Sequence, residues 1–246
     1  IYGRRMKIAV LSDIHGNLEA MHQVLADADQ QCVDHMLCLG DCIGYGPEPE
    51  AVMAEVRRRA IPSIIGNHEM AVLDRVHLNW FNPLARTSLE KTLTMLSAQS
   101  MDLIKRLPYY RVLFGCRCVH GYPPDSAQTY LFQKEAPELR QTFLSMAEPI
   151  CFIGHTHNLE LIHFDGRQVE RRALSEGITA LAPHDRYMIN VGSVGQPRDG
   201  TNHAKYIIWD QERACIDARF VPYNIAATVA KIEAAGLPLS HAKRLW

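Results

Sequence analysis

The chain has 246 residues, of which 47% are hydrophobic and 22% are charged, a composition typical of a globular protein and not of a disordered or fibrous one. The 26 Lys and Arg side chains nearly balance the 27 Asp and Glu side chains. This balance argues against nucleic acid or a membrane surface as a partner held by bulk charge, and the apolar runs are far shorter than the roughly 20 residues of a membrane-spanning helix.

In the first part of the chain, short apolar runs alternate with amphipathic helical stretches, as in βα units around a mostly parallel sheet. Residues 1–5 precede a plausible start at Met6 and are expected to be an expression remnant or an upstream extension, whereas residues 6–246 are expected to form a single domain. Asn17 is the predicted N-cap of the first helix. The predicted strands here are Lys7–Ser12, His35–Leu39 and Ile61–Ile65, and the predicted helices are Leu18–Asp29 and Glu50–Ala60.

The rest of the chain predicts helices in the middle and strands in the last third. The predicted helices are Pro83–Leu96, Met101–Leu107, Pro137–Met146 and Ile225–Ala235. The predicted strands are Arg117–Val119, Ile150–Ile153, Leu159–Phe164, Gln168–Leu174, Tyr187–Val191, Ala204–Trp209 and Cys215–Val221. Short turns at Asp165-Gly166 and Gln211-Glu212 are typical of antiparallel hairpins, so the last third predicts a second sheet. The fold class is therefore α/β, with two sheets and helices outside them.

Five predicted strands run directly into polar side chains that can bind a metal. In open α/β sheets, ligands bind beyond the carboxyl ends of the strands, so these residues are expected to meet although they are far apart in the sequence. Each histidine alone could equally be a hydrogen-bonded surface group, but five strands with the same feature favour one shared site. The candidate ligands are Asp13, His15, Asp41, Asn67, His120, His155 and His157.

The spacing and number of these candidates indicate two metal ions. Asp13 and His15, like His155 and His157, lie two residues apart, so on an extended backbone each pair is expected to project to one side and chelate. Seven donors are too many for one ion, whereas two divalent ions that share a bridging carboxylate would use them all. The mixture of nitrogen and oxygen donors without a thiolate favours manganese, iron or zinc.

The residues that follow the strands resemble, in their order, the motifs of the calcineurin-like metallophosphoesterases. The resemblance extends from Asp13 to His157 and implies a four-layer α-β-β-α sandwich of two mixed sheets flanked by helices. It also implies one metal bound by Asp13, His15 and His157, a second bound by Asn67, His120 and His155, Asp41 as the bridge, and His68 near the substrate. The motifs are Asp13-Ile14-His15, Gly40-Asp41-Cys42-Ile43-Gly44, Gly66-Asn67-His68-Glu69, Val119-His120-Gly121 and Gly154-His155-Thr156-His157.

The resemblance implies hydrolysis of a phosphodiester or phosphomonoester by a hydroxide that bridges the two metals. Two divalent cations outweigh two carboxylates and a hydroxide by about one unit of charge, so the site would attract phosphate. Protonated His68 is expected to donate to the phosphate or to the leaving oxygen, with an orienting role beside the metals as the alternative. No covalent enzyme intermediate is expected.

Two further residues are candidates for substrate binding. Arg198 follows a glycine-rich segment and is suited to forked contacts with phosphate oxygens, although a solvated arginine in a turn would have the same sequence. Tyr45 lies in a predicted loop over the site, where it would either stack on a base or cap the core. The expected partner is a small phosphoester or nucleotide substrate.

Three other features of the sequence narrow the possible functions. No arginine follows Asp41 closely, which argues against a protein phosphatase; this activity and dinucleoside polyphosphate hydrolysis are the enzymatic alternatives. A non-catalytic scaffold is expected to have lost metal-site histidines, and all are present here. Seven cysteines without a C-x-x-C pair favour buried thiols in a reducing compartment, and together with the absence of a leader pattern they predict a cytoplasmic protein.

Overall fold

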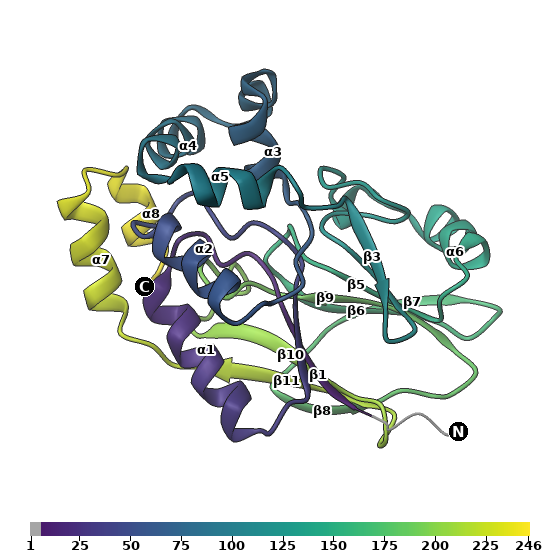
Figure 1. Ribbon diagram of the computed structural model, residues 1–246. Coiled ribbons are helices and arrows are strands. Elements are labelled where there is room, and N and C mark those ends of the chain that lie inside the picture. The colour runs from purple at the N-terminus through teal and green to yellow at the C-terminus, as the bar shows by residue number, and fades with distance from the viewer. Residues whose placement is uncertain (1–5) are drawn as a thin grey trace.

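The computed structural model describes residues 6–246, in which two β-sheets stack face to face (Figure 1). The strands are β1 (Lys7–Leu11), β2 (His35–Cys38), β3 (Tyr110–Leu113), β4 (Cys116–Val119), β5 (Ile150–Ile153), β6 (Leu159–Phe164), β7 (Val169–Ala173), β8 (Gly177–Ala180), β9 (Arg186–Val191), β10 (Ala204–Asp210) and β11 (Cys215–Val221). One sheet has the order β2-β1-β10-β11-β8 and the other β3-β4-β5-β9-β6-β7. Both sheets are mixed. In the first, β1 pairs parallel with β2 and antiparallel with β10; in the second, β5 pairs parallel with β4 and β9, whereas β6 pairs antiparallel with β7 and β9.

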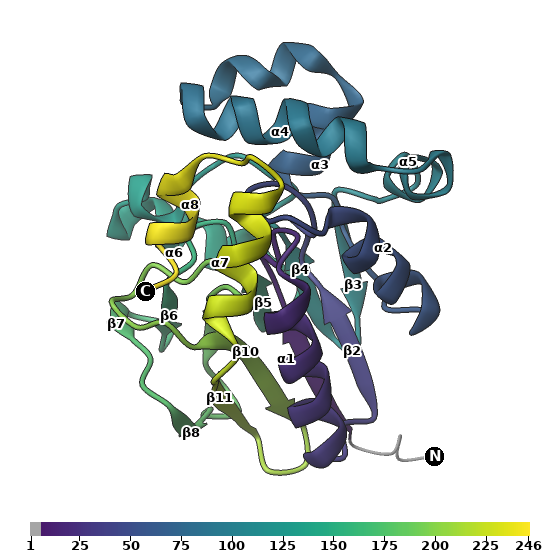
Figure 2. The same ribbon diagram turned by 90° about the vertical axis from the view of Figure 1, so that its left-hand side faces the viewer.

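Helices cover the outer faces of both sheets (Figures 1 and 2). They are α1 (Leu18–Gln30), α2 (Pro49–Arg58), α3 (Asn67–Leu73), α4 (Pro83–Met95), α5 (Ala98–Ile104), α6 (Ala136–Ser145), α7 (Ile225–Ala234) and α8 (Leu239–Lys243), with short 3₁₀ turns η1 (Arg75–Trp80) and η2 (Leu131–Gln133). The helices α3, α4 and α5 form a separate layer over one end of the sheets (Figure 2). None of the helices within residues 6–246 is both long and apolar enough to cross a membrane.

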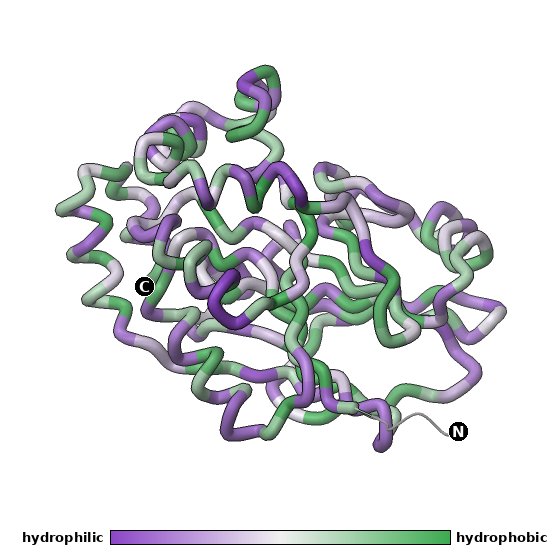
Figure 3. Tube along the Cα trace, in the orientation of Figure 1, coloured by the Kyte–Doolittle hydropathy of each residue, from purple (hydrophilic) through white to green (hydrophobic). Residues whose placement is uncertain are grey.

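The alternation of side chains along the strands separates the layers. In β1, Ile8 and Val10 pack between the two sheets, whereas Ala9 and Leu11 pack against the helices on the outer face. In β5, Phe152 belongs to the core between the sheets and its neighbours belong to the core under α6. Each such buried aliphatic or aromatic side chain contributes roughly 1.5–3 kcal/mol to stability. Hydrophobic segments accordingly follow the stacked strands (Figure 3), and the expected α-β-β-α sandwich is confirmed.

Most predicted elements are present, and the N-cap is confirmed because the Asn17 side chain accepts a hydrogen bond from the Ala20 amide. The predicted strand Ile61–Ile65 is wrong: only Ser63 forms a bridge, to Cys38, and Pro62 has no N–H to donate to a ladder. The prediction that the last third forms its own sheet is also wrong in part. The strands β6, β7 and β9 join β5, whereas β8, β10 and β11 complete the sheet of β1. Residues 1–5 lie outside the described part of the chain.

Candidate metal centre

The structure brings the seven predicted ligands together at one edge of the sheets. Each comes from a loop after β1, β2, β4 or β5, except Asn67, which is the first residue of α3. All seven side chains are buried, with Asn67 the most exposed at 8%. We call this group the centre: Asp13, His15, Asp41, Asn67, His120, His155 and His157.

Each carboxylate of the centre has one oxygen held by the protein and one that faces the histidines. Asp13 Oδ2 accepts hydrogen bonds from the Ser12 hydroxyl (2.6 Å) and the His155 amide (3.0 Å), while Asp13 Oδ1 is buried without a hydrogen-bond partner in the described residues. Asp41 Oδ1 accepts a hydrogen bond from the His68 amide (2.9 Å), and its Oδ2 lies 3.3 Å from His120 Nε2. The free oxygens are therefore available to a cation.

The four imidazoles are oriented by backbone carbonyl groups. One ring nitrogen lies within hydrogen-bond distance of a carbonyl oxygen in each case: His15 Nδ1 to Ile43 (3.0 Å), His120 Nδ1 to Leu39 (2.8 Å), His157 Nδ1 to Gln196 (2.5 Å) and His155 Nε2 to Gln128 (3.1 Å). A donated N–H at that nitrogen fixes the tautomer and leaves the other nitrogen as a lone-pair donor, which is the usual arrangement around metal-binding histidines.

The histidine and aspartate donors fall into three overlapping sets. One contains Asp13, His15 and His157, with His157 Nε2 3.1 Å from Asp13 Oδ1, and another contains Asp41, His120 and His155. The third contains His15, Asp41 and His68, so Asp41 links the first two sets. His155 and His157 therefore belong to different sets, as the resemblance implies, and do not form the chelating pair expected from their spacing. The extended backbone on which that expectation rests is absent, because φ is 68° at His155 and 63° at His157. Asp13 and His15 are also left-handed but remain in one set, so the backbone conformation alone does not decide the grouping.

The electrostatics of the centre follow from burial and from mutual proximity. Burial raises the pKa of Asp41, but the nearby His120 and His68 rings lower it more, so the net shift is downward. Burial would lower the pKa of His120, but the carboxylates of Asp41 and Asp13 raise it to about 10. Burial lowers the pKa of His157 to about 4, so this ring is neutral near pH 7 and able to coordinate a cation.

Glu69 fixes the loop that carries Asp41. Its side chain is fully buried and accepts hydrogen bonds from the backbone amides of Asp41 (2.8 Å), Cys42 (2.8 Å) and Gly66 (2.9 Å). Burial, followed by the charge of Asp41, raises the pKa of Glu69 to about 7. A Cβ atom at Gly66 would lie 2.1 Å from Asp41 Oδ1, so the close approach of these two loops requires glycine there.

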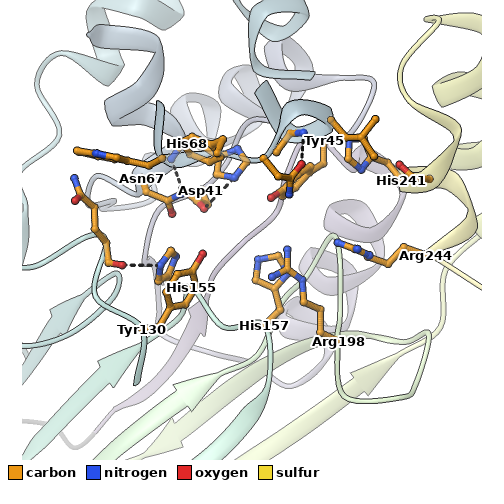
Figure 4. Close-up of a pocket in the computed structure, with 17 residues that line it drawn as sticks. Asp41, Tyr45, Asn67, His68, Tyr130, His155, His157, Arg198, His241 and Arg244 are labelled. Carbon is orange, nitrogen blue, oxygen red and sulfur yellow. Dashed lines mark hydrogen bonds and ion pairs between the residues drawn. The ribbon is translucent and has the colours of Figure 1, made fainter. Parts of the chain in front are cut away.

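A cavity of about 460 Å³ opens from the centre, within the usual range of small-molecule sites. Asp41, Asn67 and His68 face His155 and His157 across it (Figure 4). The remaining lining residues that the later argument uses are Tyr45, Trp80, Leu84, Arg198, His241 and Arg244.

Both predicted substrate-binding residues line this cavity. Arg198 is exposed and hydrogen-bonds to Gln196 Oε1 at 3.2 Å. Tyr45 is only 9% exposed, and its ring makes edge contacts with the rings of His15, His68 and His241 at 4.6 to 4.9 Å. This packing leaves little of the ring for a base and favours the capping alternative for Tyr45.

His68 lies beside the centre, with Nε2 3.8 Å from Asp41 Oδ2. The ring is 2% exposed and makes an edge contact with Phe81. Burial lowers the pKa of His68 well below its usual value, and the carboxylate of Asp41 only partly opposes this shift. This shift favours a neutral ring in the metal-free protein, whereas the expected protonated His68 concerns the site with metal and phosphate bound and stays a prediction.

Several residues of the site were not found by sequence reasoning. The sequence marks Glu69 only as the last residue of the Gly66-Asn67-His68-Glu69 motif. Its position three residues after Gly66, at the start of a helix, is the signal that indicates its capping role. Trp80, Leu84, His241 and Arg244 belong to surface helices, and no motif marks them. Arg244 in particular lies at the end of α8, a five-residue helix too short to give a periodic pattern.

The donor set fits a pair of metal ions. Seven nitrogen and oxygen donors converge, the ring nitrogens that face outward are satisfied by carbonyls, and Asp13 Oδ1 lacks a partner although it is buried. A buried, unpaired carboxylate oxygen is costly unless a cation neutralises it. The three sets of possible ligand atoms each lie within 4.8 Å of one another, a spacing compatible with coordination.

The fold and this centre are those of a metal-dependent phosphoesterase, and sequence comparison agrees. The calcineurin-like phosphoesterase superfamily domain matches residues 6–214, which is most of the chain. The chain therefore belongs to this superfamily, whose members are hydrolases of phosphoesters.

Individual relatives extend the likeness over the whole chain. A Methanocaldococcus jannaschii protein described as uncharacterized is 33% identical over 97% of both chains. The crystal structure of a metallophosphoesterase from Sphaerobacter thermophilus is 36% identical, covers 98% of both chains and has a TM-score of 0.86. A hypothetical protein from Pyrococcus horikoshii OT3 shares the fold with a TM-score of 0.79 at 17% identity, over 98% of this chain and 97% of that one.

Proposed function

We propose that the protein hydrolyses the ester bonds of small phosphodiesters or phosphomonoesters at a binuclear metal centre. The observation that carries this proposal is the position of Asp41. Its Oδ2 lies 3.3 Å from His120 Nε2 and 3.8 Å from His15 Nε2, and these two rings belong to different donor sets. One carboxylate shared by two sets is the arrangement that a pair of ions requires.

The residues that would hold the ions follow from the two sets. Asp13, His15 and His157 would bind one ion, Asn67, His120 and His155 the other, and Asp41 both. The donor types suit manganese, iron or zinc. Two such ions, when bound, supply Lewis acidity at the phosphoryl oxygens and lower the pKa of the water that attacks phosphorus.

The side chains of this chain would position and stabilise the phosphate. Asn67 Oδ1 lies 3.1 Å from His120 Nε2, so it is held at the face of the centre. A neutral His68 ring donates one hydrogen bond from Nε2 toward the phosphate or the leaving oxygen, because this nitrogen faces the centre. Arg198 binds a phosphate oxygen from the opposite side of the cavity.

We further propose that the protein acts in the cytoplasm as a single domain. The seven cysteines are all free, and six of them are buried. Buried free thiols are typical of proteins from reducing compartments. The closest pair, Cys38 and Cys42, has its sulfur atoms 3.5 Å apart.

Metal analysis combined with an ester-hydrolysis assay tests the proposal. Protein prepared without chelator in manganese-supplemented medium is expected to contain nearly two transition-metal ions per chain and to hydrolyse p-nitrophenyl phosphate or bis-p-nitrophenyl phosphate. Removal of the ions with a chelator should abolish turnover, and re-addition should restore it. A metal content near zero, or turnover that survives chelation, would refute the binuclear centre.

A further inference from the structure

The cavity beside the centre has a cationic wall of two arginines, of which the proposed hydrolysis uses only Arg198. Arg198 and Arg244 both line it, and both side chains extend toward its middle beside His157 (Figure 4). Neither guanidinium forms an ion pair with a carboxylate anywhere in residues 6–246. Two guanidinium groups that line one cavity and have no carboxylate partner can bind an anion there.

His241 adds a second, independent sign of a ligand. It is 5% exposed, lines the same cavity, and its Nε2 is buried without a hydrogen-bond partner in the described residues. Burial lowers the pKa of His241 to about 4, a hydrogen bond with the Leu84 backbone opposes this shift, and the charges of Arg244, His15 and Arg198 add to it. A buried nitrogen without a partner is costly unless a ligand or water satisfies it.

The other wall of the cavity is apolar. Trp80 and Leu84 line it and are 49% and 50% exposed, although both are large hydrophobic side chains. One face of Trp80 packs on His77, with the ring centroids 4.0 Å apart, which holds the indole in place. An exposed, immobilised indole at a cavity mouth is suited to stacking on a flat ring of the ligand.

On the basis of the phosphoester hydrolysis proposed above, we propose that the substrate is a nucleotide with two phosphate groups. One phosphate is the reacting ester at the centre, which Arg198 also contacts, the second is bound by Arg244, and the base packs on Trp80. In the reaction, the oxygen of water bonds to the reacting phosphorus, and the ester oxygen leaves with the bonding electron pair and takes up a proton. The second phosphate is unchanged and serves for recognition.

The charge and the position of α8 both support this assignment. With two ions bound, the centre is expected to hold a small net positive charge, and two further guanidinium groups exceed what a single phosphate neutralises. The match to the superfamily domain ends at residue 214, so His241 and Arg244 come from the segment that follows it. Selectivity for the second phosphate is thus contributed by a part of the chain outside the matched catalytic domain.

The test compares adenosine 5′-monophosphate with adenosine 3′,5′-bisphosphate on the metal-loaded protein. The wild type is expected to hydrolyse the bisphosphate with a kcat/KM at least tenfold higher. Arg244→Gln should reduce this ratio by about tenfold, the size of one charge-assisted hydrogen bond, and Arg244→Lys by less. The matched control is Lys243→Gln, which removes a charge from the adjacent exposed position of α8 and should leave the ratio unchanged.

Binding provides a readout that does not depend on turnover. Adenosine 3′,5′-bisphosphate should quench tryptophan fluorescence, and Trp80→Leu should remove this change although Trp209 and Trp246 remain. Arg244→Gln should shift the titration midpoint about tenfold to higher ligand concentration.

The outcomes separate the two proposals. Metal-dependent hydrolysis of p-nitrophenyl esters without any preference for the bisphosphate would overturn the substrate assignment and leave the proposed function standing. Equal loss of the preference in Lys243→Gln and Arg244→Gln would also overturn the substrate assignment, because the preference would then depend on the net charge of this segment and not on a specific contact of Arg244. Failure to hydrolyse any ester, with tight Arg244-dependent binding of the bisphosphate, would refute the proposed function and retain the binding site.

Discussion

The centre and the rim of the cavity are built on different principles. Every side chain of the centre is at least nine-tenths buried, and each imidazole is fixed by a backbone carbonyl. The rim, by which we mean Trp80, Leu84, Arg198 and Arg244, is exposed, and within residues 6–246 its two arginines have no carboxylate partner. We therefore expect the sheets to determine where the proposed hydrolysis occurs, and the helices and loops outside them to determine what the cavity accepts.

This difference has an energetic basis. Buried charges are tolerated only when they are paired and hydrogen-bonded, so a change at the centre affects neighbours that have no access to water. Exposed groups on the rim are solvated in the absence of ligand, and their loss costs the folded state little. Substitutions at the centre should accordingly change activity and stability together, whereas substitutions on the rim should change selectivity alone.

The largest expected effect comes from Asp41→Asn. The substitution keeps the shape of the side chain and leaves an oxygen to accept the His68 amide, but it removes the charge that both donor sets share. We expect kcat/KM for bis-p-nitrophenyl phosphate to fall at least about 10³-fold, equivalent to roughly 4 kcal/mol, together with a lower metal content. Steady-state kinetics and metal analysis measure both quantities.

Asp102→Asn is the control for that experiment, because Asp102 is exposed on α5 and, among residues 6–246, forms an ion pair only with Lys105. It should match the wild type in turnover and in metal content. Unchanged turnover in Asp41→Asn would show that Asp41 is not shared by two ions, and the contrast between centre and rim would lose its main support.

A smaller effect is expected from His68→Ala, which tests whether His68 is a metal ligand or lies outside the ligand set. We expect turnover to fall by about 10²-fold, within the range for loss of a positioned proton donor, while the metal content stays at the wild-type level. His68→Gln retains an N–H donor and should recover part of the rate. Loss of the ions in His68→Ala would instead make His68 a ligand, and its motif position beside Asn67 would then have been interpreted wrongly.

The grouping of the centre's residues could be predicted from the sequence, whereas the rim other than Arg198 could not, for a physical reason. Asp13, Asp41 and His120 follow short apolar strands, and strand ends converge in any parallel arrangement, so local patterns were sufficient to place them. The spacing of His155 and His157 did not reveal their left-handed backbone, because backbone conformation at a loop depends on its tertiary contacts. Trp80 and Arg244 line the same cavity only through the packing of segments far apart in the sequence, which no local pattern encodes.

A third substitution beside the centre concerns Glu69, which the sequence shows as part of a motif but whose contacts only the structure shows. Its carboxylate accepts the amides of Asp41, Cys42 and Gly66. In Glu69→Gln, one of these acceptors becomes an NH₂ group that faces a backbone N–H, so at least one buried donor is left without a partner. We expect the free energy of unfolding of the metal-free protein to decrease by about 1–3 kcal/mol, and metal affinity to fall about tenfold.

Leu84→Ser is the matched substitution on the rim, and urea unfolding measures both variants under one set of conditions. Because half of the Leu84 side chain is already exposed, the free energy of unfolding should stay within about 0.5 kcal/mol of the wild type, and the metal content should not change. If Leu84→Ser destabilised the protein as much as Glu69→Gln, the rim would be part of the packed core. The exposure of the rim would then not indicate a ligand-binding surface, and the proposal that the centre carries catalysis while the rim carries selectivity would be wrong.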